Sequence, residues 1–539
     1  MKINKIFILA AVLSQVVVNA PQILCAEKIL KRGNGAEPQS LDTHKTSGVP
    51  ESNILGDLAE GLLSVSSNGT MIPGVAEKWE VSEDGKTYTF FLRESAKWSN
   101  GDPVTADDFV YAWRRMVDPK TASNWTFIIS PVVNAADIGK GVKKIEELGV
   151  KSDRKYKLVV TLNAPTPYFL SLVSHPCMFP LHQKTVETHG DKWTRPENFV
   201  SNGAFILEEW SPQLHVKLKK NPKYWDASSV KLDGVIFYPI DDRQAELKRF
   251  KTGDIHITRM VPADQIETLK AQMPNNYRST PMYSSYYYSF NNTKAPFDNP
   301  KVRQALALAV DREKLVKQVT KGDEKPAYSM VPPAPGDYTP QEIQCRLSDT
   351  SDLVPCKSLT QSQREALSKK IFAESGYKQG EPIRIVFNTD ENHKKIAIAL
   401  SGMWKSVLGV ETELTNKEWK VYLAAREKRD YELYRQVWRA DYNDPNTFLI
   451  LLKSDSGADN TAGYFSKAYD DLMIKGAASK DLKERMDYLM GAEKQMMSDF
   501  PIIPLYYFVE NNLVSDKVLS GYEGSAMGYH LSKWIDITE

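Results

Sequence analysis

One short segment, residues 438–445, carries side chains that can bind a charged ligand. It places the carboxylate of Asp441 close to the indole of Trp438 and the guanidinium of Arg439, in a turn that ends at Pro445. A carboxylate held against an aromatic wall is a good receptor for a small cation such as the α-ammonium of a peptide. Because such clusters are also common on protein surfaces, the meaning of this one depends on the rest of the chain.

Enzyme motifs are missing from the sequence. Residues 85–87 read Gly-Lys-Thr, like the end of a phosphate-binding loop, but the glycine required five positions earlier is Glu80. No Gly-x-Ser-x-Gly, Cys-x-x-Cys or His-Glu-x-x-His occurs. The one group of possible metal ligands has spacings unlike any structural zinc site: His175, Cys177, His182 and His189. We expect no metal, no cofactor and no catalysis; an exported peptidase built from scattered residues is the alternative from another class.

The first 26 residues are predicted to be a secretion signal. Lys2 and Lys5 precede an apolar run, residues 6–18, which is too short to span a bilayer. Cleavage is expected after Ala26, and lipid attachment at Cys25 is disfavoured by the large leucine before it. Removing the signal changes the net charge from +1 to −1, so nothing indicates binding to nucleic acid.

Strand-like and helix-like segments alternate along the chain, which predicts an α/β fold. A mature chain of about 513 residues exceeds what one core usually holds, so two or three lobes are expected. Residues 86–93 alternate like a half-buried strand. Helices are predicted where caps and apolar spacing coincide, at residues 105–116 (with Thr105 as N-cap), 300–319, 361–375 and 482–497.

Cysteines and aromatic residues give further expectations. In an exported protein Cys345 and Cys356 can form a disulfide, while Cys177 is predicted to be a small buried hydrophobe. The chain has 11 Trp and 25 Tyr, enough both to fill cores and to line a ligand pocket.

Taken together, these segments resemble the periplasmic oligopeptide-binding proteins, the family 5 extracellular solute-binding components of ABC importers. The resemblance runs from about residue 30 to the last strand, with landmarks in the expected order at residues 39–45, 48–53, 73–77, 96–105, 108–113, 201–205, 221–225, 393–395 and 438–445. It implies a three-lobed type II periplasmic solute-binding fold that closes by hinge motion around a cleft, in the manner of a Venus flytrap. The lobes would be residues 27–59 with 185–283 and 510–539, residues 60–184, and residues 284–509.

The resemblance also implies a function and a site. The protein would be a periplasmic monomer that captures short peptides and delivers them to ABC transporter permease subunits in the inner membrane. Asp441 would pair with the peptide α-ammonium, and the main chain near Gly48 and Val49 and at residues 437–439 would pair with the peptide backbone. The side chains that would bind peptide carboxylates are Arg426, Arg435 and His393. The aromatic side chains that would form the walls of side-chain pockets are Trp125, Trp419, Trp438 and Phe508. Without the resemblance, the residues favour simpler interpretations: Arg435 as a structural ion-pair partner for a carboxylate such as Asp441, and His393 as an exposed histidine at a helix start.

Several positions depart from the pattern of the broad-specificity relatives. A cysteine pair common in those relatives is replaced by Ser284 and Arg439, so that cross-link is absent. Ser47 stands where a glutamate is usual, Met282 replaces a tyrosine, and Thr320 replaces a lysine. If Arg439 points into the cleft rather than to solvent, acidic peptides would be favoured. A specialised receptor for murein tripeptide or for a signalling peptide is therefore the alternative within the same class.

Overall fold

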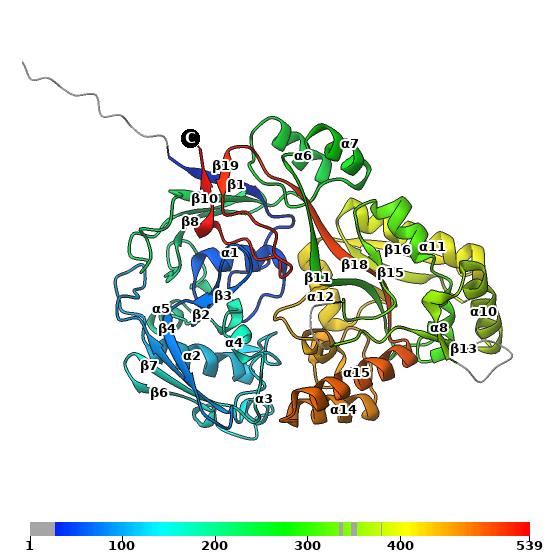
Figure 1. Ribbon diagram of the computed structural model, residues 1–539, viewed down its shortest axis with the longest axis horizontal. Coiled ribbons are helices and arrows are strands. Elements are labelled where there is room, and N and C mark those ends of the chain that lie inside the picture. The colour runs from blue at the N-terminus through cyan, green and yellow to red at the C-terminus, as the bar shows by residue number, and fades with distance from the viewer. Residues whose placement is uncertain (1–26, 334–337, 347–352, 379, 539) are drawn as a thin grey trace, which may run out of the picture.

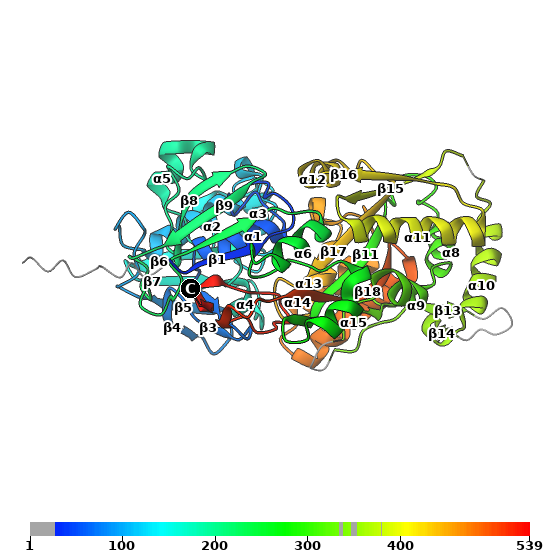
Figure 2. The ribbon, with the colours of Figure 1, turned by 90° about the horizontal axis from the view of Figure 1, so that it is seen from above.

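The computed structural model describes residues 27–333, 338–346, 353–378 and 380–538, so the expected signal at residues 1–26 lies outside the described chain. An N-terminal and a C-terminal half lie side by side, and the two views agree on this (Figures 1 and 2). Two long antiparallel strands, β11 (Tyr277–Phe290) and β18 (Ile502–Leu513), continue into the sheet of the second half. The start of β11 and the end of β18 lie beside helices α6 (Arg243–Lys251) and α7 (Ile266–Gln272) (Figure 1).

Two four-stranded sheets form the framework of the first half. One has the order β1-β10-β9-β8, with β1 parallel to β10, and the other has the order β4-β5-β7-β6 and is antiparallel. The strand predicted at residues 86–93 is β5, and alternate residues of it are buried. The strands are β1 (Ile29–Gly33), β2 (Leu63–Val65), β3 (Met71–Pro73), β4 (Ala76–Val81), β5 (Thr87–Leu92), β6 (Val150–Arg154), β7 (Lys157–Thr161), β8 (Phe205–Ser211), β9 (His215–Lys220) and β10 (Gly234–Tyr238).

The helix predicted at residues 105–116 is α2, and its start follows from the sequence. The backbone N–H of Thr105 donates to Asp108 Oδ2 at 2.7 Å, which is one half of a capping box. The helices of this half and of the connection to the second are α1 (Val49–Leu58), α2 (Ala106–Val117), α3 (Ala135–Gly139), α4 (Phe169–Leu172), α5 (Gln183–His189), α6 (Arg243–Lys251) and α7 (Ile266–Gln272).

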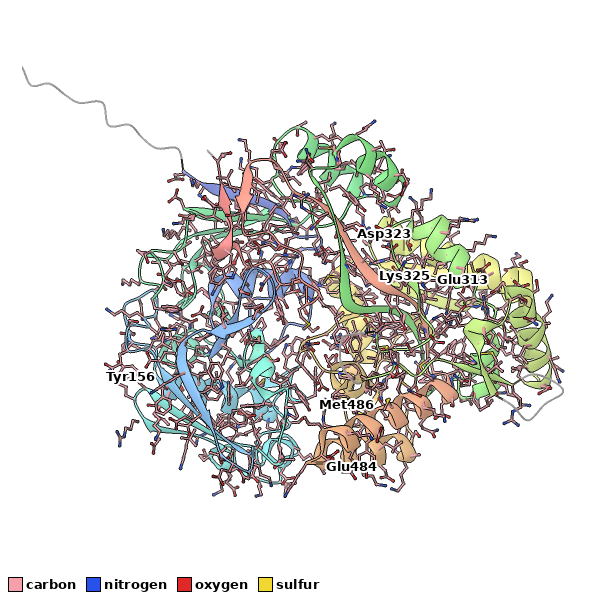
Figure 3. The ribbon with its side chains drawn as sticks, in the orientation of Figure 1. Tyr156, Glu313, Asp323, Lys325, Glu484 and Met486 are labelled. Atoms are coloured by element: carbon pink, nitrogen blue, oxygen red, sulfur yellow. A yellow bond between two sulfur atoms is a disulfide. The ribbon has the colours of Figure 1, made fainter. Side chains whose placement is uncertain are left out.

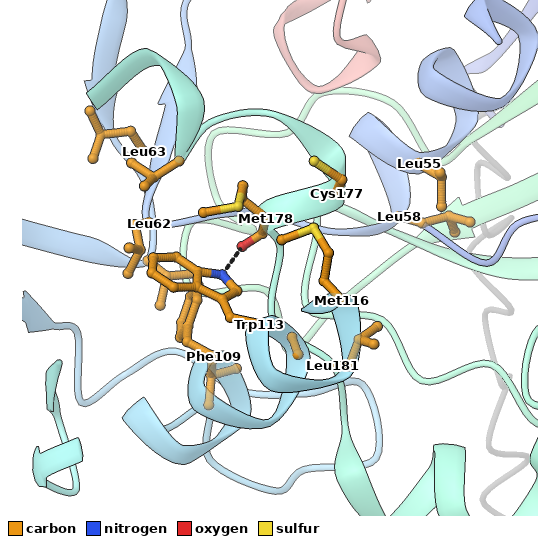
Figure 4. Close-up of a cluster of buried hydrophobic side chains, with 14 of the residues drawn as sticks. Leu55, Leu58, Leu62, Leu63, Phe109, Trp113, Met116, Cys177, Met178 and Leu181 are labelled. Carbon is orange, nitrogen blue, oxygen red and sulfur yellow. Dashed lines mark hydrogen bonds between the residues drawn. The ribbon is translucent and has the colours of Figure 1, made fainter. Parts of the chain in front are cut away.

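The apolar face of α2 packs into the core of the first half (Figure 4). The indole N–H of Trp113 donates to the carbonyl oxygen of Met178 at 2.9 Å, so the buried polar atom of this large side chain is satisfied. Cys177 lies in the same cluster, fully buried and without a disulfide, as predicted. Charged side chains such as Asp323, Lys325 and Glu484 are exposed instead (Figure 3).

The second half contains a six-stranded mixed sheet with the order β12-β18-β11-β17-β15-β16. Strand β15 is parallel to both β16 and β17, whereas β11 is antiparallel to β17 and β18. Helix α11 packs against β15 and β16. The remaining strands are β12 (Lys325–Pro326), β13 (Gln344–Arg346), β14 (Leu353–Pro355), β15 (Ile383–Asn388), β16 (Thr412–Lys417), β17 (Leu433–Arg439), β19 (Val518–Ser520) and β20 (Asp536–Ile537).

One helix prediction is wrong. The segment 300–319 does not form a single helix, because α8 ends at Leu308 and α9 begins after Asp311, whose side chain caps the new helix by accepting the N–H of Lys314 at 2.9 Å. The predictions at residues 361–375 and 482–497 are confirmed as α10 and α15. The helices of this half are α8 (Pro300–Leu308), α9 (Arg312–Leu315), α10 (Gln361–Glu374), α11 (Glu391–Leu408), α12 (Trp419–Lys428), α13 (Asn446–Leu449), α14 (Lys467–Ala478) and α15 (Leu482–Asp499).

The predicted disulfide is confirmed. Cys345 of β13 and Cys356, directly after β14, are bonded with their Cα atoms 5.0 Å apart, and both are buried in the core of the second half. Over the ranges that the structure describes, no helix is both long and apolar enough to cross a membrane.

Candidate functional site

A cavity of about 230 Å³ lies between the two halves of the molecule. Segments of the first half form one wall, and β17, α12 and the loops around them form the other. All the residues that the sequence analysis assigned to the site line this cavity: Ser47, Gly48, Val49, Trp125, His393, Trp419, Arg426, Arg435, Val437, Trp438, Arg439, Asp441 and Phe508. They are thus gathered in one place, while their roles toward a ligand remain predictions.

On the first wall, residues 47–49 lead into helix α1. Gly48 is the N-cap in an extended conformation (φ −122°, ψ 160°), and Pro50 occupies the first turn, where its missing N–H is harmless. A Cβ atom on Gly48 would lie 2.2 Å from Glu51 Oε2 and 2.7 Å from Trp419 Cζ2, a residue of the opposite wall. The two halves therefore approach so closely here that only glycine fits.

On the second wall, strand β17 presents a backbone edge to the cavity. One edge of β17 pairs with β11 from Leu433 to Arg439. The other edge pairs with β15 only at Leu433 and Tyr434 among the described residues. The stretch from Arg435 to Arg439 lines the cavity, and its backbone groups on that side are available to an added strand, except for the Arg435 carbonyl oxygen, which accepts the Tyr422 hydroxyl.

Asp441 lies two residues after the end of β17, and a hydrogen bond from its backbone N–H helps to fix its position. Its N–H donates to Thr447 Oγ1 at 3.1 Å, and its Oδ1 lies 3.5 Å from Nε2 of His175, which belongs to the first half. The Nδ1 atom of His175 accepts the backbone N–H of Cys177 at 3.3 Å, so the ring hydrogen sits on Nε2, toward Asp441. The second carboxylate oxygen, Oδ2, is buried and has no hydrogen-bond partner in the described protein.

The loop after Asp441 is fixed by a buried ion pair. Arg485 donates two parallel hydrogen bonds to Asp444, at 2.8 and 2.9 Å, and both side chains are almost completely buried. A bidentate pair of this kind fixes geometry as well as charge. The position of the Asp441 carboxylate therefore depends on α15, far away in the sequence.

Both simpler interpretations of Arg435 and His393 are wrong. Arg435 is not paired with Asp441, because it donates to Asn388 Oδ1 at 3.0 Å and lies 4.9 Å from the centre of the Tyr286 ring. His393 is buried, and its Nδ1 lies 3.2 Å from the Tyr286 hydroxyl. Burial and the nearby Arg435 hold the pKa of His393 well below its usual value, so it can hydrogen-bond a carboxylate but cannot neutralise one.

Polar contacts across the cavity include residues that the sequence analysis missed. Arg243 of the first half donates to Asp390 of the second at 2.8 Å; burial would raise the pKa of this carboxyl, but Arg243 and His393 lower it below its usual value. Arg426 donates to Ser47 Oγ at 2.7 Å, again joining the two halves. Nothing in the local sequence marks the Arg243–Asp390 pair, because its members lie 147 positions apart.

Aromatic side chains line both walls of the cavity. The Trp125 ring lies 4.6 Å from that of His175, its indole N–H donating to Thr46 O, and Trp438 lies 6.5 Å from Phe127. Within the described chain no group of histidines, cysteines and carboxylates is arranged to hold a metal ion.

Arg439 points into the cavity rather than to open solvent. Its Nη1 donates to the carbonyl oxygen of Gly528 at 3.0 Å, and its guanidinium lies 5.5 Å from the centre of the Tyr529 ring. Ser284 is its neighbour across the sheet, at the position where the relatives' cross-link is absent.

Comparisons with known proteins agree with this arrangement. The family of "Bacterial extracellular solute-binding proteins, family 5 Middle" matches residues 70–460. The chain is 41% identical over 508 residues to the periplasmic oligopeptide-binding protein OppA of Salmonella typhimurium, covering 93% of this chain and 91% of that protein. Haemophilus influenzae OppA, solved in complex with RPPGFSPFR, superposes with a TM-score of 0.89 at 37% identity, covering 96% of this chain and all of the other.

A third relative bears on the arrangement of the halves. The Escherichia coli murein tripeptide binding protein MppA superposes with a TM-score of 0.90 at 34% identity, with 96% and 100% of the two chains covered. Against the unliganded open form of MppA the TM-score is only 0.65, with 95% and 98% covered. The halves described here are therefore not arranged as in that open form. On the family match and these identities over most of its length, the chain belongs to the family 5 bacterial extracellular solute-binding proteins.

Proposed function

We propose that this protein is the periplasmic substrate-binding component of an ABC importer, which captures short oligopeptides in the cavity and delivers them to a membrane permease. The observation that carries the proposal is Oδ2 of Asp441, a buried carboxylate oxygen without a hydrogen-bond partner in the described protein. An unpaired buried charge is strongly unfavourable, and a peptide α-ammonium supplies both the donor and the opposite charge.

The open edge of β17 supports a peptide rather than a free amine. Backbone groups from Val437 to Arg439 can pair with a peptide added as a strand, while the side-chain walls of Trp125, Trp419 and Trp438 tolerate different residues. Arg435 has no carboxylate partner among the described residues and can receive a peptide carboxylate. This division lets the protein recognise what all peptides share.

Export and partners follow from the same proposal. The secretion signal at residues 1–26 with cleavage after Ala26 would place the mature protein in the periplasm, where the Cys345–Cys356 disulfide is stable. The lobe boundaries predicted from the sequence would let the two walls separate and close, and the closed form would dock on the permease. No catalytic step is proposed.

Calorimetry with Ala-Ala-Ala and its N-acetylated form tests the assignment of Asp441. In Asp441→Asn the free-amine peptide should bind with an affinity lower by about 3 kcal/mol or more, which is roughly 100-fold, because the ammonium loses its buried partner. Asp241→Asn is the matched control, since Asp241 is an exposed carboxylate at the rim of the same cavity. Unchanged affinity in Asp441→Asn would overturn the proposal, and recovery of cleaved peptide would support the peptidase alternative.

A further inference from the structure

Five arginines line the cavity, and they differ in how their charge is balanced. Three have a carboxylate partner in the described protein, and two do not. Arg435 is bonded to an amide oxygen, and Arg439 only to a backbone carbonyl oxygen. The paired ones are Arg243 with Asp390, Arg259 with Glu510 and Arg426 with Asp459.

A second arginine lies close to Arg439, at the edge of the main cavity. Behind it lies a small chamber that shares Val49, Arg259 and Arg439 with the main cavity. The charged residues that line this chamber are Arg32, Arg259, Arg439 and Glu510, together with His530, so arginines outnumber carboxylates three to one in its lining. The chamber lies next to the peptide cavity.

The single carboxylate of this cluster is already committed. Glu510 accepts hydrogen bonds from Arg259 and from His530, the latter at 3.0 Å. Burial alone would raise its pKa, but these partners lower the pKa to about 2, so Glu510 is ionised and occupied. Two buried nitrogen atoms, Arg32 Nε and His530 Nδ1, have no hydrogen-bond partner in the described protein. Glu510 thus leaves Arg439 without an anion of its own.

We propose that Arg439, supported by Arg259, forms an anion subsite that selects peptides with an aspartate or glutamate among their first two residues. This inference rests on the proposed function, because it assumes that the α-ammonium lies at Asp441. The chamber holds about 10 Å³, room for roughly one water. The ligand carboxylate therefore lies on the cavity side of Arg439.

Distance along the peptide identifies which carboxylate reaches Arg439. Arg439 precedes Asp441 by two positions, roughly 7 Å along an extended chain. The terminal carboxylate of an extended tripeptide lies about 10 Å from its amino group, and that of a longer peptide lies farther away. A side-chain carboxylate on the first or second residue is the anion within reach, so the subsite reads sequence rather than length.

Calorimetry with the series Ala-Glu-Ala, Ala-Gln-Ala and Ala-Lys-Ala, and with Glu-Ala-Ala and Gln-Ala-Ala, tests the subsite. The wild-type protein should bind one of the glutamate peptides at least 10-fold more tightly than its glutamine counterpart, and Ala-Lys-Ala least tightly. In Arg439→Gln the glutamate-to-glutamine ratio should fall below about 2, while Arg439→Lys should retain part of it. Thermal unfolding with and without Ala-Ala-Ala verifies that each variant is folded and closes on peptide.

Lys420→Gln is the matched control, because Lys420 is an exposed cation next to Trp419 and does not line the cavity. It should leave the glutamate preference unchanged. Equal affinities for glutamate and glutamine peptides in the wild-type protein, or a preference that survives in Arg439→Gln, would overturn the subsite while Asp441-dependent binding of Ala-Ala-Ala still stands. Failure of every peptide to bind would instead refute the proposed function and the subsite with it.

Discussion

Gly48 offers a direct test of whether peptide binding requires the two walls to meet. Alanine is compatible with its backbone, because φ is −122° and ψ is 160°. The added Cβ would lie 2.7 Å from Trp419 Cζ2, where ordinary contacts begin at 3.4 Å, so the opposite wall would have to move back by about 0.7 Å. The nearest atom, Glu51 Oε2 at 2.2 Å, belongs to a fully buried side chain whose Oε1 accepts the backbone N–H of Gln39 at 2.6 Å, so alanine also disturbs a contact within the first half.

The expected effect of Gly48→Ala falls on closure and, through Glu51, also on folding. Overpacking of this size costs about 1–3 kcal/mol, which corresponds to roughly 5- to 150-fold weaker peptide binding. Because the contact with Trp419 joins the two halves, the unliganded protein can avoid that contact by opening, whereas the contact with Glu51 remains and should lower the unfolding free energy as well. Calorimetry with Ala-Ala-Ala measures the affinity, and small-angle X-ray scattering measures the contraction on adding peptide.

Gly402→Ala is the control for Gly48→Ala. Gly402 is exposed on helix α11 and has no atom within 4 Å of a Cβ built on it, so alanine should raise stability slightly and leave binding alone. Wild-type affinity together with full contraction in Gly48→Ala would refute the reasoning, since it would mean that the walls do not need to approach as described.

Three further changes test individual interactions. Burial raises the pKa of Asp57 from 3.8 to about 6, so the contribution of its protonated carboxyl to folding stability is complete below pH 3.8 and is lost as pH rises through 6. Between pH 4 and 7.5 the unfolding free energy of Asp57→Asn, measured with denaturant, should therefore rise by roughly 3 kcal/mol relative to that of the wild-type protein. Parallel pH profiles of the two proteins would contradict this. Arg485→Met leaves Asp444 buried without its partner and should lower the unfolding free energy by about 3–5 kcal/mol. An unchanged melting temperature would show that the pair is unimportant for stability. Replacing Cys345 and Cys356 together by serine should cost about 3 kcal/mol or less and leave peptide affinity unchanged, since neither residue lines the cavity; weaker binding would disprove that independence.

Elements with a local chemical signal could be predicted from the sequence. Thr105 as N-cap marked the start of α2, and alternation marked β5, because both signals depend on residues a few positions apart. The same local reasoning failed at residues 300–319, where apolar spacing continued but the carboxylate of Asp311 starts a new helix. A pattern of side chains does not reveal which of two competing local bonds forms.

For the candidate site, too, the features with a local signal could be predicted and those that depend on distant segments could not. The residues around Asp441 were identified by type, but their gathering into one cavity was predicted from the family resemblance rather than from spacing. The partners of those residues were not foreseen. His175 was noted as a poor metal ligand and instead lies 3.5 Å from Asp441, and Arg243 had no signal at all. Such pairs depend on how two distant walls meet, and no local pattern encodes that.

The unpaired atom of Asp441 also explains why closure should depend on ligand. With the walls together and no peptide present, Oδ2 is buried without a hydrogen-bond donor. Burying a charged oxygen without a partner costs several kcal/mol. Opening returns that oxygen to water and removes the penalty, whereas a bound ammonium removes it without opening. A ligand can shift an equilibrium only by its differential affinity for the two states, and here that difference resides largely in one carboxylate. A better-satisfied Asp441, for example one bonded to an internal arginine, would make a more stable closed form and a poorer receptor.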